Sequence, residues 1–306
     1  MNTQDKIIIT GAAGLVGQNL LLLLREKGFC NLVAIDKHAE NMALLQKRNP
    51  SVQCVSADLS VPGEWEHHFN DAQYVIILHA QVTSLYLTEF EKNNLTATEH
   101  VLNAIKKNNI VFTVHVSSSV VNSVANDDYT NTKKAQEKRV LDSNIACCVL
   151  RPTLMFGRFD PKHFGWLSRF MEKTPIFPIP GDGKYLRQPL YSRDFCRIII
   201  SALEKKPSGK IFDIAGLEEM NYIDIIYLIK KIKKSKTMII KIPYRLFYGI
   251  IKIAGMISSK PPFTTDQLKA LTAGDYFVGV DYEKEFKVTP TPLRQAFEES
   301  YGNARE

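Results

Sequence analysis

A tyrosine and a lysine four residues apart, Tyr129 and Lys133, have the spacing needed for proton chemistry. Residues i and i+4 share one face of a helix, and an ammonium group near a phenol lowers the phenol's pKa. The phenol then becomes a usable base near neutral pH. Ser117, Ser118 and Ser119 directly follow the apolar run Val111–Val116, so one of their hydroxyls can hydrogen-bond the same substrate oxygen. A Tyr-x-x-x-Lys spacing also arises by chance on helix surfaces. Whether it is functional here therefore depends on the elements around it.

The N-terminal segment supplies the first of these elements. Three isoleucines, Ile7–Ile9, read as a buried strand, and three glycines follow at Gly11, Gly14 and Gly17 before the apolar run Leu20–Leu24. Glycine permits positive φ and close approach of the backbone to a ligand, and the N–H groups of a new helix attract phosphate. The pattern predicts a dinucleotide site; the alternative is an ordinary tight strand-to-helix turn.

Acidic and small residues at the ends of later strands extend this interpretation. Asp36 ends the run Leu32–Ile35, where an acidic residue holds a ribose hydroxyl pair and repels a 2′-phosphate, so NAD is favoured over NADP. The neighbouring Lys37 and His38 can soften that preference. Asp58 is expected beside the adenine pocket, with a turn or helix-cap role as the alternative. Ala80 is small enough for close cofactor approach.

Strand and helix patterns alternate through the first half of the chain, which predicts an α/β fold with a Rossmann-type, doubly wound parallel sheet. We expect strands over 7–9, 32–35, 52–55, 74–78 and 111–116, a helix over 90–107, and a sixth strand that ends at Leu150. Residues 1–155, with a returning segment at 188–215, form the predicted NAD-binding domain. Residues 156–187 and 216–306 form a smaller C-terminal substrate domain, irregular over 156–180 apart from a helix near 166–171.

Composition narrows the class of protein further. The chain has 306 residues, no run long enough to span a bilayer and no visible signal peptide, and its five cysteines lack metal-type spacing. We therefore expect reduced thiols, a cytoplasmic protein and no metal site. The net charge of +7 suits an anionic partner. The dinucleotide pattern explains that charge better than nucleic-acid binding, which we exclude.

One apolar helix has two interpretations. Residues 244–257 are unusually apolar, Arg245 and Lys252 interrupt them, and a lysine-rich stretch precedes them. The helix either packs on the substrate domain or lies on an anionic membrane surface as a peripheral contact at the inner face.

The order of these motifs resembles that of the extended short-chain dehydrogenase/reductase family, in particular its NAD-dependent sugar epimerases. The resemblance extends from Lys6 to about Phe297. The matching pieces are TGAAGLVG (10–17), Asp36, Asp58 with Leu59, NLTAT (94–98), HVSSSVV (115–121), YTNTK (129–133), LRPTLMFG (150–157) and GDGKYLRQPLYSRD (181–194).

The resemblance implies a role for each matched position. Ser118, Tyr129 and Lys133 are the catalytic set, with Ser119 as the alternative serine and Lys133 also binding the nicotinamide ribose. The implied cofactor contacts are Gly11, Ala13, Gly14, Leu15, Val16, Gly17, Asp36, Lys37, Asp58, Leu59 and Ala80. The implied substrate contacts are Thr83, Ser119, Asn122 and Arg187. Arg187 either binds a substrate phosphate or is an ordinary surface arginine.

The resemblance also implies the reaction. We expect an NAD-dependent epimerase, acting at C4 by transient hydride transfer, on a sugar linked to a nucleotide diphosphate or a polyprenyl diphosphate. Such an enzyme serves surface polysaccharide or glycoconjugate biosynthesis, and homodimers are usual in the family. The alternatives are an NAD(P)-dependent reductase or dehydrogenase of a keto-sugar or other carbonyl compound, and a non-catalytic NAD(P)-binding assembly subunit.

Departures from the family pattern concern the substrate rather than the cofactor. Only about ten residues separate the serines from Tyr129, Leu154 replaces the usual substrate-binding asparagine, and Asn122 replaces a common aromatic residue. Ser119 and Val120 stand where dehydratases carry an acidic pair, which argues against a 4,6-dehydratase.

Overall fold

The computed structural model describes residues 1–257, 265–274 and 277–302, and the chain divides into two compact units. The first unit comprises residues 1–155, 192–215 and 279–290, and the second comprises 156–191, 216–278 and 291–306. Residues 279–290 therefore belong to the first unit, although the sequence placed them in the substrate domain. The predicted domain end at residue 306 lies outside the described residues.

A seven-stranded sheet forms the centre of the first unit, with the strand order β11-β6-β5-β4-β1-β2-β3, and every pairing is parallel. Its strands are β1 (Ile7–Thr10), β2 (Leu32–Asp36), β3 (Gln53–Ser56), β4 (Tyr74–Ile77), β5 (Phe112–Val116), β6 (Cys147–Pro152) and β11 (Ile211–Ile214). The isoleucines of β1 are fully buried, as expected for a central strand covered on both faces. The predicted Rossmann-type sheet is confirmed.

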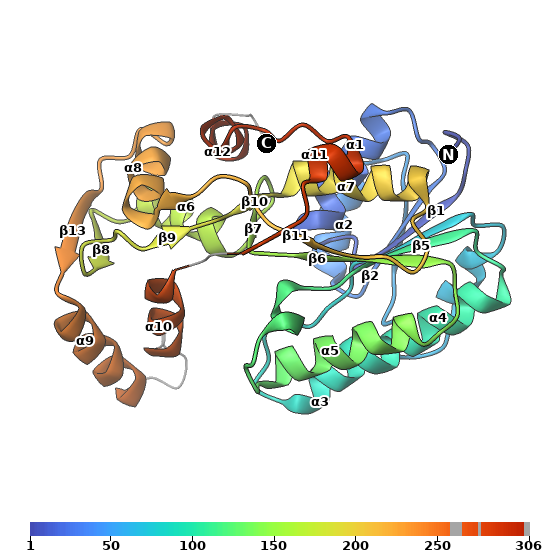
Figure 1. Cartoon of the computed structure of the whole chain (residues 1–306), viewed down its shortest axis with the longest axis horizontal. Helices are drawn as coiled ribbons and strands as arrows, with labels where there is room; N and C mark the ends of the chain where they lie inside the picture. Colours follow the sequence, from blue (N-terminus) through green and yellow to red (C-terminus); the bar gives the residue numbers. More distant parts are fainter. Residues whose placement is uncertain (258–264, 275–276, 303–306) are drawn as a thin grey trace. The chain divides into compact units, whose positions relative to one another are not determined.

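Helices cover both faces of this sheet (Figure 1): α1 (Leu15–Glu26) and α7 (Ser192–Lys205) on one side, α4 (Ala97–Lys107) and α5 (Asp128–Leu141) on the other. The remaining helical elements of this unit are α2 (Ala39–Arg48), the 3₁₀ turn η1 (Glu64–Phe69), α3 (Leu87–Phe90), the π-helical turn η2 (Glu91–Thr96), the 3₁₀ turn η3 (Ser119–Asn122) and α11 (Tyr282–Phe286). Residues 90–107 are thus helical as predicted, but they begin with a π turn. Such turns are frequent at functional sites.

The second unit is built from helices and short strand pairs. Its helices are α6 (His163–Lys173), α8 (Tyr222–Ile232), α9 (Tyr244–Ile257), α10 (Thr265–Ala273) and α12 (Leu293–Tyr301). Strand β8 (Ile176–Pro180) pairs in parallel with β13 (Met238–Ile242), and β9 (Leu186–Arg187) pairs antiparallel with β12 (Met220–Asn221). A further short pair joins β7 (Met155–Phe156) and β10 (Leu190–Tyr191). Stacking of Phe156 on Phe297, with ring centroids 4.3 Å apart, ties the last helix to this core.

Two sequence expectations are wrong. The sixth strand does not end at Leu150, because Arg151 and Pro152 continue it by pairing with β11. The region 156–180 is not irregular, because it contains the full helix α6 and strand β8. Pro178 and Pro180 hid that strand in the sequence. Prolines are tolerated there because, among the described residues, β8 pairs only with β13 and is therefore an edge strand.

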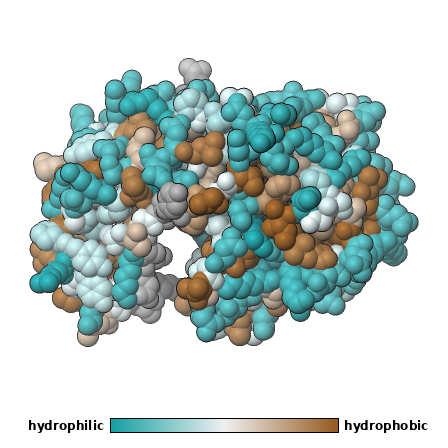
Figure 2. Space-filling view, in the orientation of Figure 1, coloured by the Kyte–Doolittle hydropathy of each residue, from teal (hydrophilic) through white to brown (hydrophobic). Residues whose placement is uncertain are grey.

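The molecule is mostly hydrophilic on the face drawn in Figure 2, and its cysteines are free thiols. Figure 2 shows hydrophilic residues over most of the face drawn, with smaller hydrophobic patches between them. Cys147, Cys148 and Cys196 are buried free thiols, whereas Cys30 is exposed. Within the described ranges, no helix combines the length and apolar character that crossing a bilayer requires.

Candidate active site

The glycine-rich turn joins β1 to α1, and its geometry requires two of its glycines. Gly11 has φ +67°, and a Cβ there would lie 2.6 Å from the backbone nitrogen of His79. A Cβ on Gly17 would overlap the carbonyl of Ala12. Gly14 is the N-cap of α1, and no side chain caps the helix there. The first N–H groups of α1 are therefore left for an anionic group of a ligand.

The carboxylate of Asp36 lies beside this turn. It accepts hydrogen bonds from the backbone N–H groups of Ala13, at 3.1 Å, and His38, at 3.0 Å. The carboxylate at the end of β2 is thus fixed next to the glycine-rich turn. A dinucleotide site needs an acidic group at this position to bind the ribose. Lys37 donates to the side chain of Asn93 at 2.8 Å, so its amine is engaged by η2.

Asp58 forms a local turn and an ion pair. Its carboxylate accepts hydrogen bonds from the backbone N–H and the hydroxyl of Ser60 and pairs with Lys92 at 3.0 Å. Partial burial would raise the pKa of Asp58, but these contacts outweigh it and lower the pKa to about 2. The neighbouring Leu59 is buried in the core. Asp58 therefore has the turn role that the sequence left open, and its adenine role stays a prediction.

Tyr129 lies at the start of α5, and its phenol is near the side chain of Ser118, which follows β5. Ser118 also caps η3 by accepting the N–H of Val120 at 3.4 Å. Burial raises the pKa of Tyr129, and the nearby Ser118 hydroxyl only partly opposes this. The structure thus brings the predicted tyrosine and serine together, and Ser118 rather than Ser119 makes the contact.

The amine of Lys133 points elsewhere. Its hydrogen-bond partners are the side-chain oxygen of Gln136, at 2.5 Å, and the carbonyl of Val116, at 3.3 Å. Burial lowers the pKa of Lys133 to about 7, although the nearby Glu137 opposes this. In this structure Lys133 is held by Gln136 and Val116, and burial raises the pKa of Tyr129, so the expected lowering of that pKa is not seen here. The role of Lys133 toward Tyr129 stays a prediction.

A chain of polar side chains continues from Gln136 into the sheet. Gln136 donates to the hydroxyl of Thr98 at 2.8 Å, and Thr98 also bonds the Nε2 atom of His79 at 3.0 Å. The Nδ1 atom of His79 bonds the hydroxyl of Thr10 at 2.8 Å, at the end of β1. Burial, together with the charge of Lys133, lowers the pKa of His79 to about 3, so the ring is neutral. We call this set, Thr10, His79, Thr98, Gln136 and Lys133, the buried polar chain.

The sequence reasoning missed the inner members of this chain. Gln136 follows Lys133 by three residues, which is the same helix face, so helical spacing was an available signal. His79 carried no such signal, and Thr98 lay in the matched piece NLTAT without an assigned role; only the fold brings both to α5. The same holds for Asn94, whose amide donates to the hydroxyl of Thr132 at 3.1 Å and so ties η2 to α5.

Comparison with known proteins decides the family. The model of the "NAD dependent epimerase/dehydratase family" matches residues 7–215. The chain belongs to this family. No curated protein sequence matches it.

Solved structures similar to this epimerase/dehydratase family member share the fold along nearly the whole chain. UDP-glucuronic acid 4-epimerase from Bacillus cereus, in complex with NAD, is 23% identical with a TM-score of 0.72 and covers 97% of this chain and 95% of its own. UDP-glucose 4-epimerase from Thermotoga maritima, with UDP-glucose, is 18% identical with a TM-score of 0.76 and 97% coverage of both chains. A dTDP-glucose 4,6-dehydratase from Streptomyces venezuelae is 14% identical with a TM-score of 0.75, covering 97% and 95%.

The predicted substrate contacts have partners of different kinds. The side-chain amide of Asn122 donates to Asp213 at 2.8 Å and accepts from Arg151 at 3.0 Å. Both of its hydrogen-bond partners therefore belong to the first unit. Arg151 in turn forms a partly buried ion pair with Glu137 at 2.5 Å. Thr83 is exposed, and its carbonyl accepts a hydrogen bond from the side chain of Gln81.

Arg187 belongs to the second unit and is only 9% exposed. Its guanidinium donates to the carbonyl of Leu271 at 3.3 Å. The surface-arginine alternative is therefore excluded. A buried guanidinium suits an anionic ligand, so the phosphate role stays a prediction.

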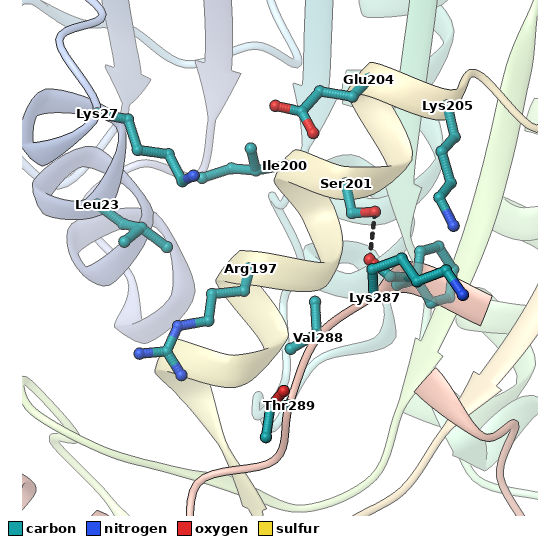
Figure 3. Close-up of a pocket in the computed structure, with 11 residues that line it drawn as sticks. Leu23, Lys27, Arg197, Ile200, Ser201, Glu204, Lys205, Lys287, Val288 and Thr289 are labelled. Carbon is teal, nitrogen blue, oxygen red and sulfur yellow. Dashed lines mark hydrogen bonds between the residues drawn. The ribbon is translucent and has the colours of Figure 1, made fainter. Parts of the chain in front are cut away.

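The cavity in Figure 3, of about 580 Å³, is not the candidate site. It lies between the C-terminal end of α1, at Leu23 and Lys27, and residues of α7 and the segment after α11. The helix α1 has 12 residues, so this end is about 18 Å from the glycine-rich turn. In the described part of the chain, no group of three or more His, Cys, Asp or Glu side chains is arranged to hold a metal ion.

Proposed function

We propose that this epimerase/dehydratase family member is an NAD-dependent sugar 4-epimerase. Its substrate would be a sugar on a nucleotide diphosphate or a polyprenyl diphosphate, used in surface polysaccharide or glycoconjugate synthesis in the cytoplasm. The observation that carries the proposal is the placement of Ser118, directly after β5, near Tyr129, at the start of α5, at the carboxyl end of the sheet. Ligands of such sheets bind at that end. The two 4-epimerases that share the fold add support by analogy.

The glycine-rich turn fits NAD. The uncapped start of α1 offers N–H groups from Leu15, Val16 and Gly17 to a diphosphate, and Gly14 leaves that approach open. Asp36 would bind the adenosine ribose. The other proposed cofactor contacts are Gly11, Ala13, Lys37, Asp58, Leu59, Ala80 and Lys133. Bound NAD supplies the hydride acceptor and donor that the epimerisation needs.

Tyr129 carries the proton chemistry in this proposal. Its phenolate form takes the proton of the sugar hydroxyl as the carbon is oxidised, and the phenol returns it when the carbon is reduced from the other face. Ser118 orients the phenol and hydrogen-bonds the same substrate oxygen. Because burial raises the pKa of Tyr129, the phenol must be deprotonated by a further contribution. A cationic Lys133 that approaches the phenol would provide it.

The substrate side of the proposal rests on four residues, Thr83, Ser119, Asn122 and Arg187. Elimination of water needs an additional acid and base, and Ser119 and Val120 offer neither. An epimerase is therefore favoured over a dehydratase, although one dehydratase shares the fold. As in the family, we propose a homodimer.

The decisive experiment is to denature the purified protein and identify the nucleotides that it releases. Stoichiometric NAD would support a closed cycle in which the cofactor never leaves. Release of NADP would refute the Asp36 argument. Release of neither, with consumption of added NADH by keto-sugars, would establish the reductase alternative instead.

A matched pair of variants then tests the site. Tyr129→Phe should retain NAD and lose about 10²–10⁴-fold in turnover of UDP-sugars. Tyr227→Phe, at an exposed tyrosine of α8, should change neither. Full epimerase activity of Tyr129→Phe would refute the assignment. Retention of NAD without turnover of any nucleotide-linked or lipid-linked sugar would favour a non-catalytic subunit.

A further inference from the structure

A continuous segment of the second unit carries only positive charges. Residues 225–257 contain no Asp or Glu. The cations in this segment are Lys230, Lys231, Lys233, Lys234, Lys236, Lys241, Arg245 and Lys252. The segment runs from α8 through a loop and β13 to α9, so the charges lie along one edge of that unit (Figure 1). We call residues 230–257 the basic edge.

Helix α9 adds an exposed apolar stripe to the basic edge. Leu246, Ile250 and Ile253 are 58%, 51% and 60% exposed. They are four and three residues apart, so they lie on one side of the helix. Ile251, on the opposite side, is 8% exposed. The side of α9 that holds Ile251 is packed, whereas the side that holds the stripe is exposed. Packing on the substrate domain, the first of the two sequence interpretations, therefore accounts for only one side of the helix.

Two cations lie on one flank of the same helix. Arg245 and Lys252 are seven residues apart, which is about two helical turns, so they lie on the same side of α9. Both are exposed. At about 100° per residue, both lie roughly 110–130° around the helix from the centre of the stripe, on the flank that does not hold Ile251. Cations beside an apolar face are typical of helices that lie in a lipid interface.

The loop before β13 provides a second set of cations beside a groove. The groove, of about 460 Å³, is lined by Lys173 from α6 and by Lys233, Lys234 and Lys236. Its one carboxylate, Glu172, pairs with Lys233 at 3.0 Å, and Lys234 and Lys236 are exposed. Met238, the first residue of β13, is 62% exposed next to them.

We propose that the basic edge binds the surface of an anionic phospholipid bilayer, with the stripe of α9 at the acyl boundary and the lysines at the headgroup phosphates. Charge complementarity favours lipid over a second copy of the chain. A two-fold interface would place this patch against itself, and cations would then face cations. The binding needs no catalytic turnover, so its test is independent of the proposed reaction.

The test is flotation of the full-length protein with vesicles. We expect binding to vesicles of phosphatidylcholine and phosphatidylglycerol at low ionic strength, weaker binding at high ionic strength, and none to phosphatidylcholine alone. Lys234→Glu/Lys236→Glu/Lys252→Glu should lower the affinity at least about 100-fold, because each cation near the surface contributes about fivefold.

Matched controls separate a local surface from overall charge. Lys106→Glu/Lys107→Glu/Lys210→Glu makes the same charge change at exposed lysines of the first unit and should bind within about threefold of wild type, because those lysines lie outside the basic edge. Leu246→Ser/Ile253→Ser tests the stripe and should remove the binding that persists at high ionic strength. Thermal unfolding of each variant confirms that it folds.

Three outcomes would overturn the proposal. The first is no flotation of the wild type with anionic vesicles at low ionic strength. The second is an equal loss of binding in the control triple variant. The third is absence of vesicle binding together with a dimer, seen by sedimentation velocity, that Leu246→Ser/Ile253→Ser dissociates, since this would assign the stripe to a second copy.

Discussion

Gln136 should set the protonation of Lys133, and two substitutions at this position should shift it in opposite directions. Burial lowers the pKa of Lys133 from the ordinary 10.5 to about 7, and the side-chain oxygen of Gln136 accepts its hydrogen bond at 2.5 Å. Gln136→Leu removes that acceptor and leaves the ammonium less stabilised, so the pKa of Lys133 should fall further. Gln136→Glu places a carboxylate there, so the pKa should rise.

The size of the effect follows from the hydrogen bond. A hydrogen bond to a charged group contributes about 1.5–3 kcal/mol, and one pKa unit corresponds to about 1.4 kcal/mol. Gln136→Leu should therefore lower the pKa of Lys133 by about one to two units. In the unfolded chain Lys133 has the ordinary pKa of 10.5. At a pH between about 7 and 10.5, the unfolded chain therefore binds more protons than the folded chain. The free energy of unfolding then rises with pH, by about 2 kcal/mol between pH 7 and pH 9 in the wild type.

The assay is urea unfolding between about pH 5 and pH 9.5. Lys133→Met is also made in the wild type and in each Gln136 variant. The difference in the free energy of unfolding with and without Lys133 then gives the contribution of this lysine at each pH. In the wild type the difference should begin to rise near pH 7. The rise should begin about one to two units lower in Gln136→Leu and above pH 7 in Gln136→Glu. The same onset in both variants would refute the reasoning, because Gln136 would then not determine the charge of Lys133.

Two further predictions concern the framework of the site. Glu137→Ala should lower the free energy of unfolding by about 1.5–3 kcal/mol, because the partly buried Arg151 loses this ion pair and keeps only weaker contacts to Asp213 and Asn122; urea unfolding measures this, and a loss below about 1 kcal/mol would contradict it. Gly11→Ala should abolish NAD retention or folding, because its Cβ would lie 2.6 Å from a backbone nitrogen. Gly209→Ala, at φ +74° with open space around it, is the control, and should cost only about 1–2 kcal/mol.

The sequence determined the elements whose signals are local. The isoleucines of β1, the glycines after them and the apolar run of α1 are adjacent in the chain, so they predicted the strand, the turn and the helix together. Repetition of apolar strands and amphipathic helices then predicted the parallel sheet, because strands covered on both faces read as continuous apolar runs. A serine after β5 near Tyr129 was also accessible from the order of these elements, whereas the choice of Ser118 over Ser119 came from the family resemblance.

Only the tertiary structure decided what surrounds the candidate catalytic side chains. The direction of the Lys133 amine depends on Gln136, Thr98, His79 and Thr10, which are far apart in the chain and meet only in the folded unit. Burial of Arg187 was equally invisible, because its solvent exposure is a property of its neighbours. A residue type and its spacing give the possible chemistry. Solvation and hydrogen-bond partners, which set the pKa and the direction of the charge, come from packing.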